Sequence, residues 1–237
     1  MGVIHLRLGD IERAKEYQEH ALAIRLNKLG PDYHNLATIY YQLGLIHLRL
    51  GDIKRAKECQ ERALAIRLNK LGPDHPDVAT IYSQLGDIHL RLGDIKQAKE
   101  YQERALAIWL KKLGPDHLPV ANTYSRLGHI HEQLGDIEQA KEYQERALVI
   151  WLNRLGPYHT DVATAYSYLG LTYLRLGDRE RAKEYQDRAL AIMVRKLGPD
   201  HTDVAYLYTY FSLSLTQIAF DEAEGEIWSS KKIQFNE

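Results

Sequence analysis

The chain of 237 residues contains one cysteine, Cys59, and so cannot form an internal disulfide. Such scarcity is typical of proteins from reducing compartments. Lys and Arg (31) balance Asp and Glu (32), and the net charge of -1 provides no basic field to attract nucleic acid. No apolar run approaches the roughly 20 residues of a membrane-spanning helix. The first residues also lack the cationic start and apolar core of a secretory signal. We therefore expect a cytoplasmic protein that binds neither nucleic acid nor membranes.

Catalytic and metal-binding motifs are missing as well. The sequence contains no nucleophile elbow, phosphate-binding loop, H-E-x-x-H motif or cysteine pair. Several histidines share one repeated position, where successive copies should stand about 10 Å apart, because packed helices are about 8–10 Å apart. One zinc ion cannot bridge them, since its ligands bind at about 2 Å. These histidines are His5, His47, His89 and His131. We predict a protein without enzymatic activity, cofactor or bound metal.

What the sequence has in abundance is repetition. The pair Gly-Asp recurs every 42 residues from Gly9-Asp10 to Gly177-Asp178, and the triplet Leu-Gly-Pro recurs with the same period from Leu29 to Leu197. Residues 3–29 and 45–71 differ at only four positions. Such a period indicates an array of structural repeats, in which each unit buries its apolar face against the next.

Each repeat is predicted to form two helices. In the first, residues 77–92, one face is marked by residues three or four apart: Val78, Ile81, Tyr82, Leu85 and His89. Gly93 can adopt a positive φ and end this helix, and Asp94 is a favourable N-cap for the second. The second helix, residues 95–113, should bury Ile95, Ala98, Tyr101 or Gln102, Ala105 and Ile108. Its outer face carries the charge pairs Lys99/Glu103 and Glu100/Arg104. In the preceding loops, we expect histidines to start the first helices: His75, His117, His159 and His201.

Landmarks of the tetratricopeptide repeat stand at the spacing of that family: Tyr82, Leu85, Gly86, Ala98 and Ala105. The chain therefore resembles this family, and its period of 42 rather than about 34 residues is similar to kinesin light chains and nephrocystin-3-like arrays. The resemblance implies an all-α, right-handed α-solenoid of stacked antiparallel helix pairs and a non-catalytic protein–protein interaction scaffold. Glutamine replaces the family's aromatic residue in the middle of the second helix (Gln18, Gln60, Gln102, Gln144, Gln186). The groove asparagine of many peptide-binding members is replaced by Gln42, Gln84, Arg126 and Tyr168.

We expect one array over residues 1–237. Its parts are a truncated first repeat (1–30), four full units (31–72, 73–114, 115–156, 157–198) and a degenerate C-terminal repeat or cap (199–237). The sequence starts halfway through a first helix, which suggests a piece of a longer array. An alternative function follows from this start: a self-assembly module that stacks through its terminal repeats into dimers or larger assemblies. The apolar residues expected to be exposed there are Ile11, Ala14, Ala21 and Ile24.

In the family that this chain resembles, the first helix of each repeat lines the concave face, and this implies a peptide-binding stripe. The stripe comprises Thr38, Tyr41, Gln42, Leu45, Leu48 and Arg49; Thr80, Ser83, Gln84, Asp87, Leu90 and Arg91; Asn122, Ser125, Arg126 and His129; and Thr164, Ser167, Tyr168, Leu171 and Arg175. Two interpretations remain open: a solvated face that drifts freely, or a groove for a partner's peptide or helix with acidic and apolar residues. In the second, Leu48, Leu90 and Leu174 provide apolar contacts, and Arg49, Arg91 and Arg175 pair with carboxylates. Trp109 and Trp151 replace Arg25 and Arg67 at one repeated position, and we expect them to cover the next repeat, with an exposed interface patch as the alternative.

Overall fold

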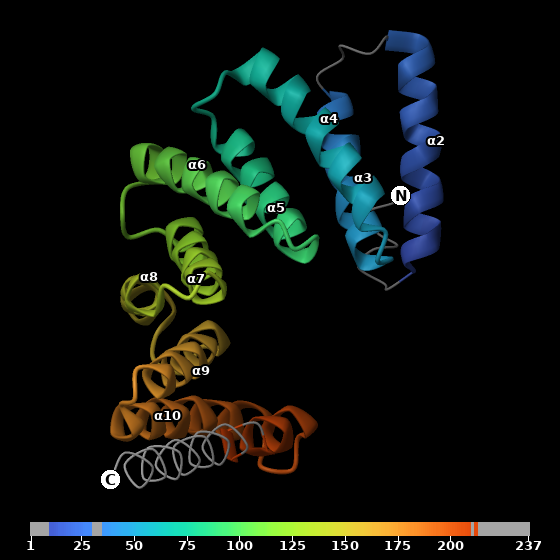
Figure 1. Cartoon of the computed structure of the whole chain (residues 1–237). Coiled ribbons are helices and arrows are strands. Elements are labelled where there is room, and N and C mark those ends of the chain that lie inside the picture. Colours follow the sequence, from blue (N-terminus) through green and yellow to red (C-terminus); the bar gives the residue numbers. More distant parts are fainter. Residues whose placement is uncertain (1–9, 30–34, 210, 213–237) are drawn as a thin grey trace, which may run out of the picture. The chain divides into compact units, whose positions relative to one another are not determined.

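The computed structural model describes residues 10–29, 35–209 and 211–212, and their regular secondary structure is entirely helical (Figure 1). The helices are α2 (Ile11–Leu29), α3 (Asn35–Arg49), α4 (Ile53–Leu71), α5 (Pro76–Arg91), α6 (Ile95–Leu113), α7 (Leu118–Gln133), α8 (Ile137–Leu155), α9 (Thr160–Arg175) and α10 (Arg179–Leu197). Residues 202–209 are also helical. The predicted all-α fold is therefore confirmed, and α5 and α6 have nearly the bounds expected from the sequence.

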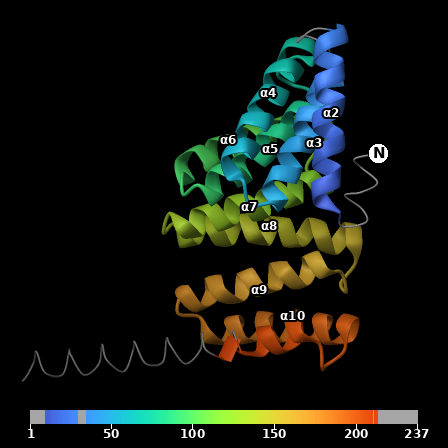
Figure 2. The same cartoon turned by 90° about the vertical axis from the view of Figure 1, so that its right-hand side faces the viewer.

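The chain divides into two compact units, residues 1–134 and 135–237. In the first unit, α3 packs against α4, α5 against α6, and both α4 and α6 also contact the helix that follows them. In the second unit, α9 packs against both α8 and α10 (Figures 1 and 2). Within each unit, the helices therefore form layers of first and second helices, as a repeat array requires.

The turn inside each repeat follows the sequence prediction. Gly93 has a φ of 78°, a value that is costly for residues with a Cβ. The carboxylate of Asp94 then accepts a hydrogen bond from the backbone N–H of Gln97 at 3.2 Å and caps α6. The same cap recurs before α4, α8 and α10, at Asp52, Asp136 and Asp178.

Loop histidines start three of the helices. The side chain of His75 accepts a hydrogen bond from the backbone N–H of Asp77 at 3.1 Å, and His159 and His201 make the same contact two residues ahead. His117 makes no such cap. The reason is that the residue two positions ahead is Pro119, which has no backbone N–H to donate. The prediction is thus confirmed at three of the four histidines.

The buried face of α5 is the one that the spacing predicts. Its Leu85 is fully buried, and His89 is 6% exposed, with its Nδ1 atom 3.3 Å from the carboxylate of Asp94. His47 and His131 are buried at the equivalent positions. Among the described residues, no group of three or more His, Cys, Asp or Glu side chains is placed to hold a metal ion. No described helix is long and apolar enough to cross a membrane.

The glutamine that stands in place of the family's aromatic residue packs against the glycine of the first helix. A Cβ on Gly86 would lie 2.6 Å from the Nε2 atom of Gln102, so the glutamine lies directly over the glycine. Gln102 is fully buried, and its Nε2 atom donates to the backbone oxygen of Ser83 and to Asp87, both at 3.0 Å. Tyr101 is only half-buried, so the residue on the inner face of α6 is the glutamine.

The first described helix, α2, corrects part of one prediction. Ala14, expected to be exposed, is fully buried because α2 lays this small residue into its packed face, while Ile24 is 42% exposed. Ile11 and Ala21 are half-buried.

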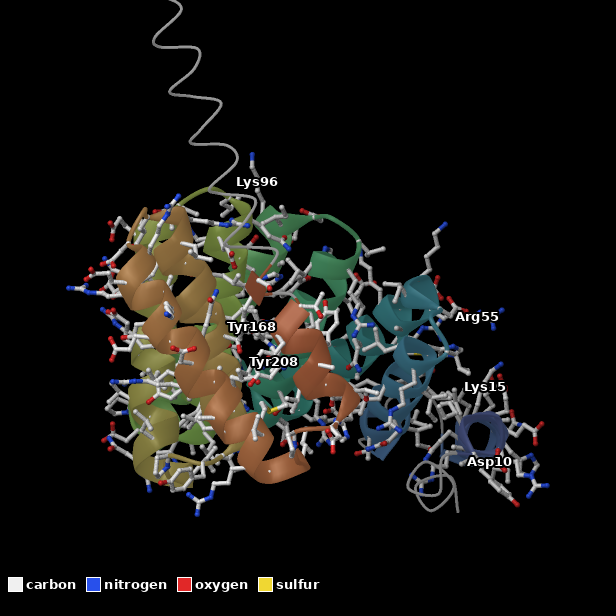
Figure 3. The ribbon with its side chains drawn as sticks, turned by 90° about the horizontal axis from the view of Figure 1, so that it is seen from below. Asp10, Lys15, Arg55, Lys96, Tyr168 and Tyr208 are labelled. Carbon is white, nitrogen blue, oxygen red and sulfur yellow. The ribbon has the colours of Figure 1, made fainter. Side chains whose placement is uncertain are left out.

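The second helices also carry charged side chains that point away from the ribbon, among them Arg55 on α4 and Lys96 on α6 (Figure 3).

Candidate functional site: the first-helix stripe and its two pockets

The predicted stripe lies mostly on accessible surface in both units. Every predicted stripe residue except Ser83, which is 8% exposed, is half-buried or exposed. Arg49, Arg91 and Arg175 are all exposed, at the ends of α3, α5 and α9. One further expectation is wrong. Leu174 is 4% exposed and belongs to the core, so it offers a ligand little apolar surface.

A pocket of about 230 Å³ lies on the stripe in the first unit, between α3, α4 and α5. The predicted stripe contributes four of its lining residues, and three more were not predicted. The lining consists of Thr38, Tyr41, Gln42, Arg67, Asp77, Thr80 and Ile81.

Arg67 closes this N-terminal pocket with a polar bridge. Its guanidinium donates to the hydroxyl of Thr38 at 2.9 Å and forms an ion pair with Asp77 at 3.2 Å. The Arg67 side chain is 23% exposed and that of Asp77 is 49% exposed. Burial also raises the pKa of Tyr41, whose phenol is therefore uncharged at neutral pH. The pocket thus presents hydroxyl groups and an ion pair that is already formed.

Further along the first unit, stripe residues bind one another. The carboxylate of Asp87 accepts a hydrogen bond from Arg126 Nε at 2.7 Å, which joins α5 to α7, and it also accepts from Gln102. Burial raises the pKa of Asp87, and the nearby charge of Arg126 opposes this shift. Ser83 donates to the oxygen of Gln102 at 3.3 Å. This cluster fixes the orientation of the stripe between two successive repeats.

The remaining stripe residues of the first unit add apolar and polar surface. Leu45, Leu48, Gln84, Leu90 and Ser125 are half-buried, and Asn122 is exposed. His129 lies 3.0 Å from the side-chain nitrogen of Gln133 and 3.7 Å from the carboxylate of Glu132. The half-buried leucines provide apolar area beside exposed polar groups, which is the composition expected of a peptide-binding surface.

The second unit contains a larger pocket of about 410 Å³ between α9, α10 and the helical residues 202–209. The predicted stripe contributes Thr164, Ser167, Tyr168 and Leu171, and Figure 3 labels Tyr168. The hydroxyl groups of Thr164 and Ser167 donate to backbone oxygens of α9, at 3.1 and 3.0 Å. The lining that was not predicted consists of Ala163, Met193, Asp203, Tyr206, Leu207 and Phe211.

Residues that sequence reasoning missed come from the second helix and from the start of the next first helix. Arg67 and Met193 occupy the repeated position at which Trp109 and Trp151 were noted in the sequence. Their variation from Arg through Trp to Met was a visible signal. It predicts coverage of the next repeat, whereas Arg67 and Met193 line pockets in the structure. The buried positions of Trp109 and Trp151, 8% and 4% exposed, agree with that coverage.

The single cysteine, Cys59, is in the lining of neither pocket. The thiol of Cys59 is half-buried, and burial raises its pKa to about 11, so it is protonated at neutral pH. The thiolate, which is the reactive form, is therefore scarce under those conditions. Both pockets are lined by hydroxyl, carboxylate and apolar groups, and the N-terminal pocket also contains the guanidinium of Arg67.

Comparison with known proteins agrees with the repeats and the fold. The tetratricopeptide repeat family model matches residues 1–69, 49–111, 77–153, 119–193 and 161–225, and the chain therefore belongs to the tetratricopeptide repeat family. No curated protein matches the sequence. Tetratricopeptide repeats generally serve as protein–protein interaction scaffolds.

Solved structures of the same fold include proteins related to kinesin light chains. BtubC (BKLC) from P. vanneervenii is 29% identical, with a TM-score of 0.72 over 83% of this chain and 78% of that chain. A kinesin light chain-like protein from Podosopora anserina with nearly identical TPR-like repeats is 22% identical, with a TM-score of 0.69 over 83% and 93% of the two chains. MamA from Desulfovibrio magneticus is 20% identical, with a TM-score of 0.61 over 83% and 93%. These likenesses support an α-solenoid.

Proposed function

We propose that the chain is a non-catalytic scaffold that binds a peptide or helix of a partner protein along the first-helix stripe. The observation that carries the proposal is the coincidence of the stripe with both pockets. In each unit, several residues predicted from sequence line the pocket, together with neighbours from the second helix and the next repeat. Concave sites with mixed apolar and polar lining are the usual sites of recognition.

The exposed arginines extend this surface toward acidic ligands. Arg49 and Arg91 end α3 and α5 next to the half-buried Leu48 and Leu90. An exposed Arg–carboxylate pair contributes at most about 1 kcal/mol, whereas micromolar affinity needs about 8 kcal/mol. Apolar burial at about 25 cal/mol per Å² must therefore supply most of the binding, and the arginines select among apolar peptides.

A peptide display screen tests this proposal. The purified chain is screened beside the triple variant Arg49→Glu, Arg91→Glu and Arg175→Glu. A control of equal charge change replaces three exposed lysines of the second helices, Lys54, Lys96 and Lys183, by Glu. We expect acidic–apolar motifs that bind the chain and the lysine control but not the arginine variant. Equal binding by both variants would show that the arginines take no part.

Self-assembly is a second candidate, favoured by the apolar surface of α2. Ile24 is 42% exposed on this helix, and such a side chain can pack on another copy. Light scattering over a concentration series measures the association directly, with Ile24→Glu as the variant that should weaken it. A mass that stays monomeric at every concentration would exclude this function.

A further inference from the structure

The two pockets are the same site in two repeats. Each of the seven residues that line the N-terminal pocket has a counterpart 126 positions later, three periods of 42, in the lining of the C-terminal pocket. The pairs are Thr38/Thr164, Tyr41/Ser167, Gln42/Tyr168, Arg67/Met193, Asp77/Asp203, Thr80/Tyr206 and Ile81/Leu207. The repeat therefore contains a recurring pocket whose chemistry is set by the side chains that each copy supplies.

One position of the second helix changes from a charged to an aromatic and then to a thioether side chain among the copies, and we call its occupant the gate residue. The gate residues of successive repeats are Arg67, Trp109, Trp151 and Met193. Trp109 belongs to the first unit, in the layer where α6 contacts α7, and it is 8% exposed. The repeat therefore accommodates a buried indole ring at the gate position.

The C-terminal copy has the space that such a ring needs. Met193 is narrower than Trp, and its pocket measures about 410 Å³, within the range of about 300–1,000 Å³ that ligand sites span. The N-terminal pocket, about 230 Å³ with Arg67 bridged to Thr38 and Asp77, falls below that range. Leu171, Leu207 and Phe211 add apolar and aromatic lining around Met193. The C-terminal pocket is thus the copy suited to an aromatic side chain from outside.

A carboxylate at this pocket has lost the cationic partner that its counterpart has. Asp77 pairs with Arg67 at 3.2 Å, but Met193 carries no charge to offer Asp203. The Asp203 carboxylate instead lies 3.7 Å from Nδ1 of His201, and its side chain is 66% exposed. A lysine or arginine on a ligand would restore the ion pair that the first unit makes internally.

We propose that the C-terminal pocket binds an aromatic side chain of a partner peptide with a lysine or arginine beside it. The ring takes the space that the gate tryptophan fills from within in the repeat of Trp109. The ligand's cation pairs with Asp203 in place of the missing gate arginine. This proposal rests on the proposed function, because Thr164, Ser167 and Leu171 of the stripe form one wall of the pocket.

Methionine NMR tests the pocket directly, because the chain has only two methionines, Met1 and Met193. The chain is labelled at the methionine methyl carbons and titrated with N-acetyl-Lys-Trp-amide. We expect the ring current of the bound indole to shift the Met193 signal and leave that of Met1 in place. N-acetyl-Glu-Trp-amide should bind about threefold more weakly, as for an exposed charge pair, and N-acetyl-Lys-Ala-amide should cause no shift. An unmoved Met193 signal, or equal binding of the Lys and Glu probes, would overturn the proposal.

Gate variants provide the matched controls, with binding of fluorescein-labelled Lys-Trp peptide measured by anisotropy. Met193→Trp should fill the pocket and weaken binding at least about tenfold, whereas Met193→Leu, of similar volume, should retain it. Lys183→Trp places the same ring on an exposed position of α10 outside the pocket lining and should leave binding unchanged. Undiminished binding by the Met193→Trp variant would refute the pocket.

The two proposals fail separately. Arg49, Arg91 and Arg175 line neither pocket, so their charge reversal should not alter the Met193 shift. Loss of library binding in that variant with an intact Met193 shift supports both proposals. Library binding that depends on the arginines, together with an unmoved Met193 signal, removes the aromatic pocket alone.

Discussion

The two pockets occupy equivalent positions in the repeat but differ in the contacts among their lining side chains. In the first unit, Arg67 bridges the hydroxyl of Thr38 and the carboxylate of Asp77, so the polar groups satisfy one another. In the second unit, Met193 leaves a larger, more apolar space, and Asp203 contacts His201 more distantly. The exchange of Arg67 for Met193 therefore removes the bridge to the pocket's carboxylate, while four other lining positions also differ between the two copies. In a near-identical array, specificity can be set by the gate on the second helix as well as by the stripe on the first.

The largest expected effect on stability comes from removing the buried side chain of the gate residue Trp109. Trp109→Ala removes a side chain that is 8% exposed, and loss of a buried Trp typically costs about 3–5 kcal/mol of unfolding free energy. The urea midpoint of unfolding measures it, with Leu110→Ala as the control because Leu110 is 36% exposed. The control should cost less than about 1 kcal/mol. If both variants unfolded alike, Trp109 would not act as a filled gate.

A smaller effect separates two loop histidines. His75→Ala should cost about 1 kcal/mol because it removes the cap on the backbone N–H of Asp77. His117→Ala should cost almost nothing through this cause, since His117 makes no side-chain cap before Pro119. Urea unfolding of the two variants gives the difference. Equal losses would mean that the histidines act through contacts other than the cap.

Arg67→Met gives the N-terminal pocket the same gate residue as the C-terminal pocket. The ion pair that it breaks is partly exposed, so we expect the stability loss to stay below about 1 kcal/mol. The new methyl group at position 67 also adds a third methionine signal. That signal should shift with N-acetyl-Lys-Trp-amide, because Asp77 loses its internal cation as Asp203 has. If the signal of the methionine at position 67 does not shift with the peptide, changing the gate residue alone is not sufficient for binding.

Much of the fold was predictable because the helices and turns of each repeat depend on residues close together in the sequence. The turn at Gly93-Asp94 and the buried face of α5 are local consequences of glycine conformation, capping and helical spacing. The missed site residues depend on tertiary packing. Asp77 and Arg67 are ten residues apart on different helices, and only the fold brings them to one pocket. The burial of Leu174 likewise could not be inferred from α9 alone, since Leu48 and Leu90 at the same position are half-buried.

The smallest effect tests Asp87, whose counterpart in the second unit is the apolar Leu171. Burial raises the pKa of Asp87 above its usual value of 3.8, so the folded state holds this proton more tightly than the unfolded state. Its contribution to stability is therefore present at low pH and is lost as pH rises through the folded pKa. Asn cannot ionise, so Asp87→Asn should not lose stability in this way. The urea midpoint of the variant, relative to that of the unmodified chain, should therefore rise as pH increases above 3.8.

The expected gain is below about 1 kcal/mol, because the Asp87 side chain is 27% exposed and Arg126 opposes the shift. The same comparison in an Arg126→Gln background removes that opposing charge and should enlarge the gain. A midpoint difference that moves the other way would mean that the attraction of Arg126 outweighs burial. Asp87 would then be a stabilising ion-pair partner of α7 at neutral pH. In that case Leu171 of the second unit would lack a stabilising ion pair of this kind and would instead provide apolar lining for the C-terminal pocket.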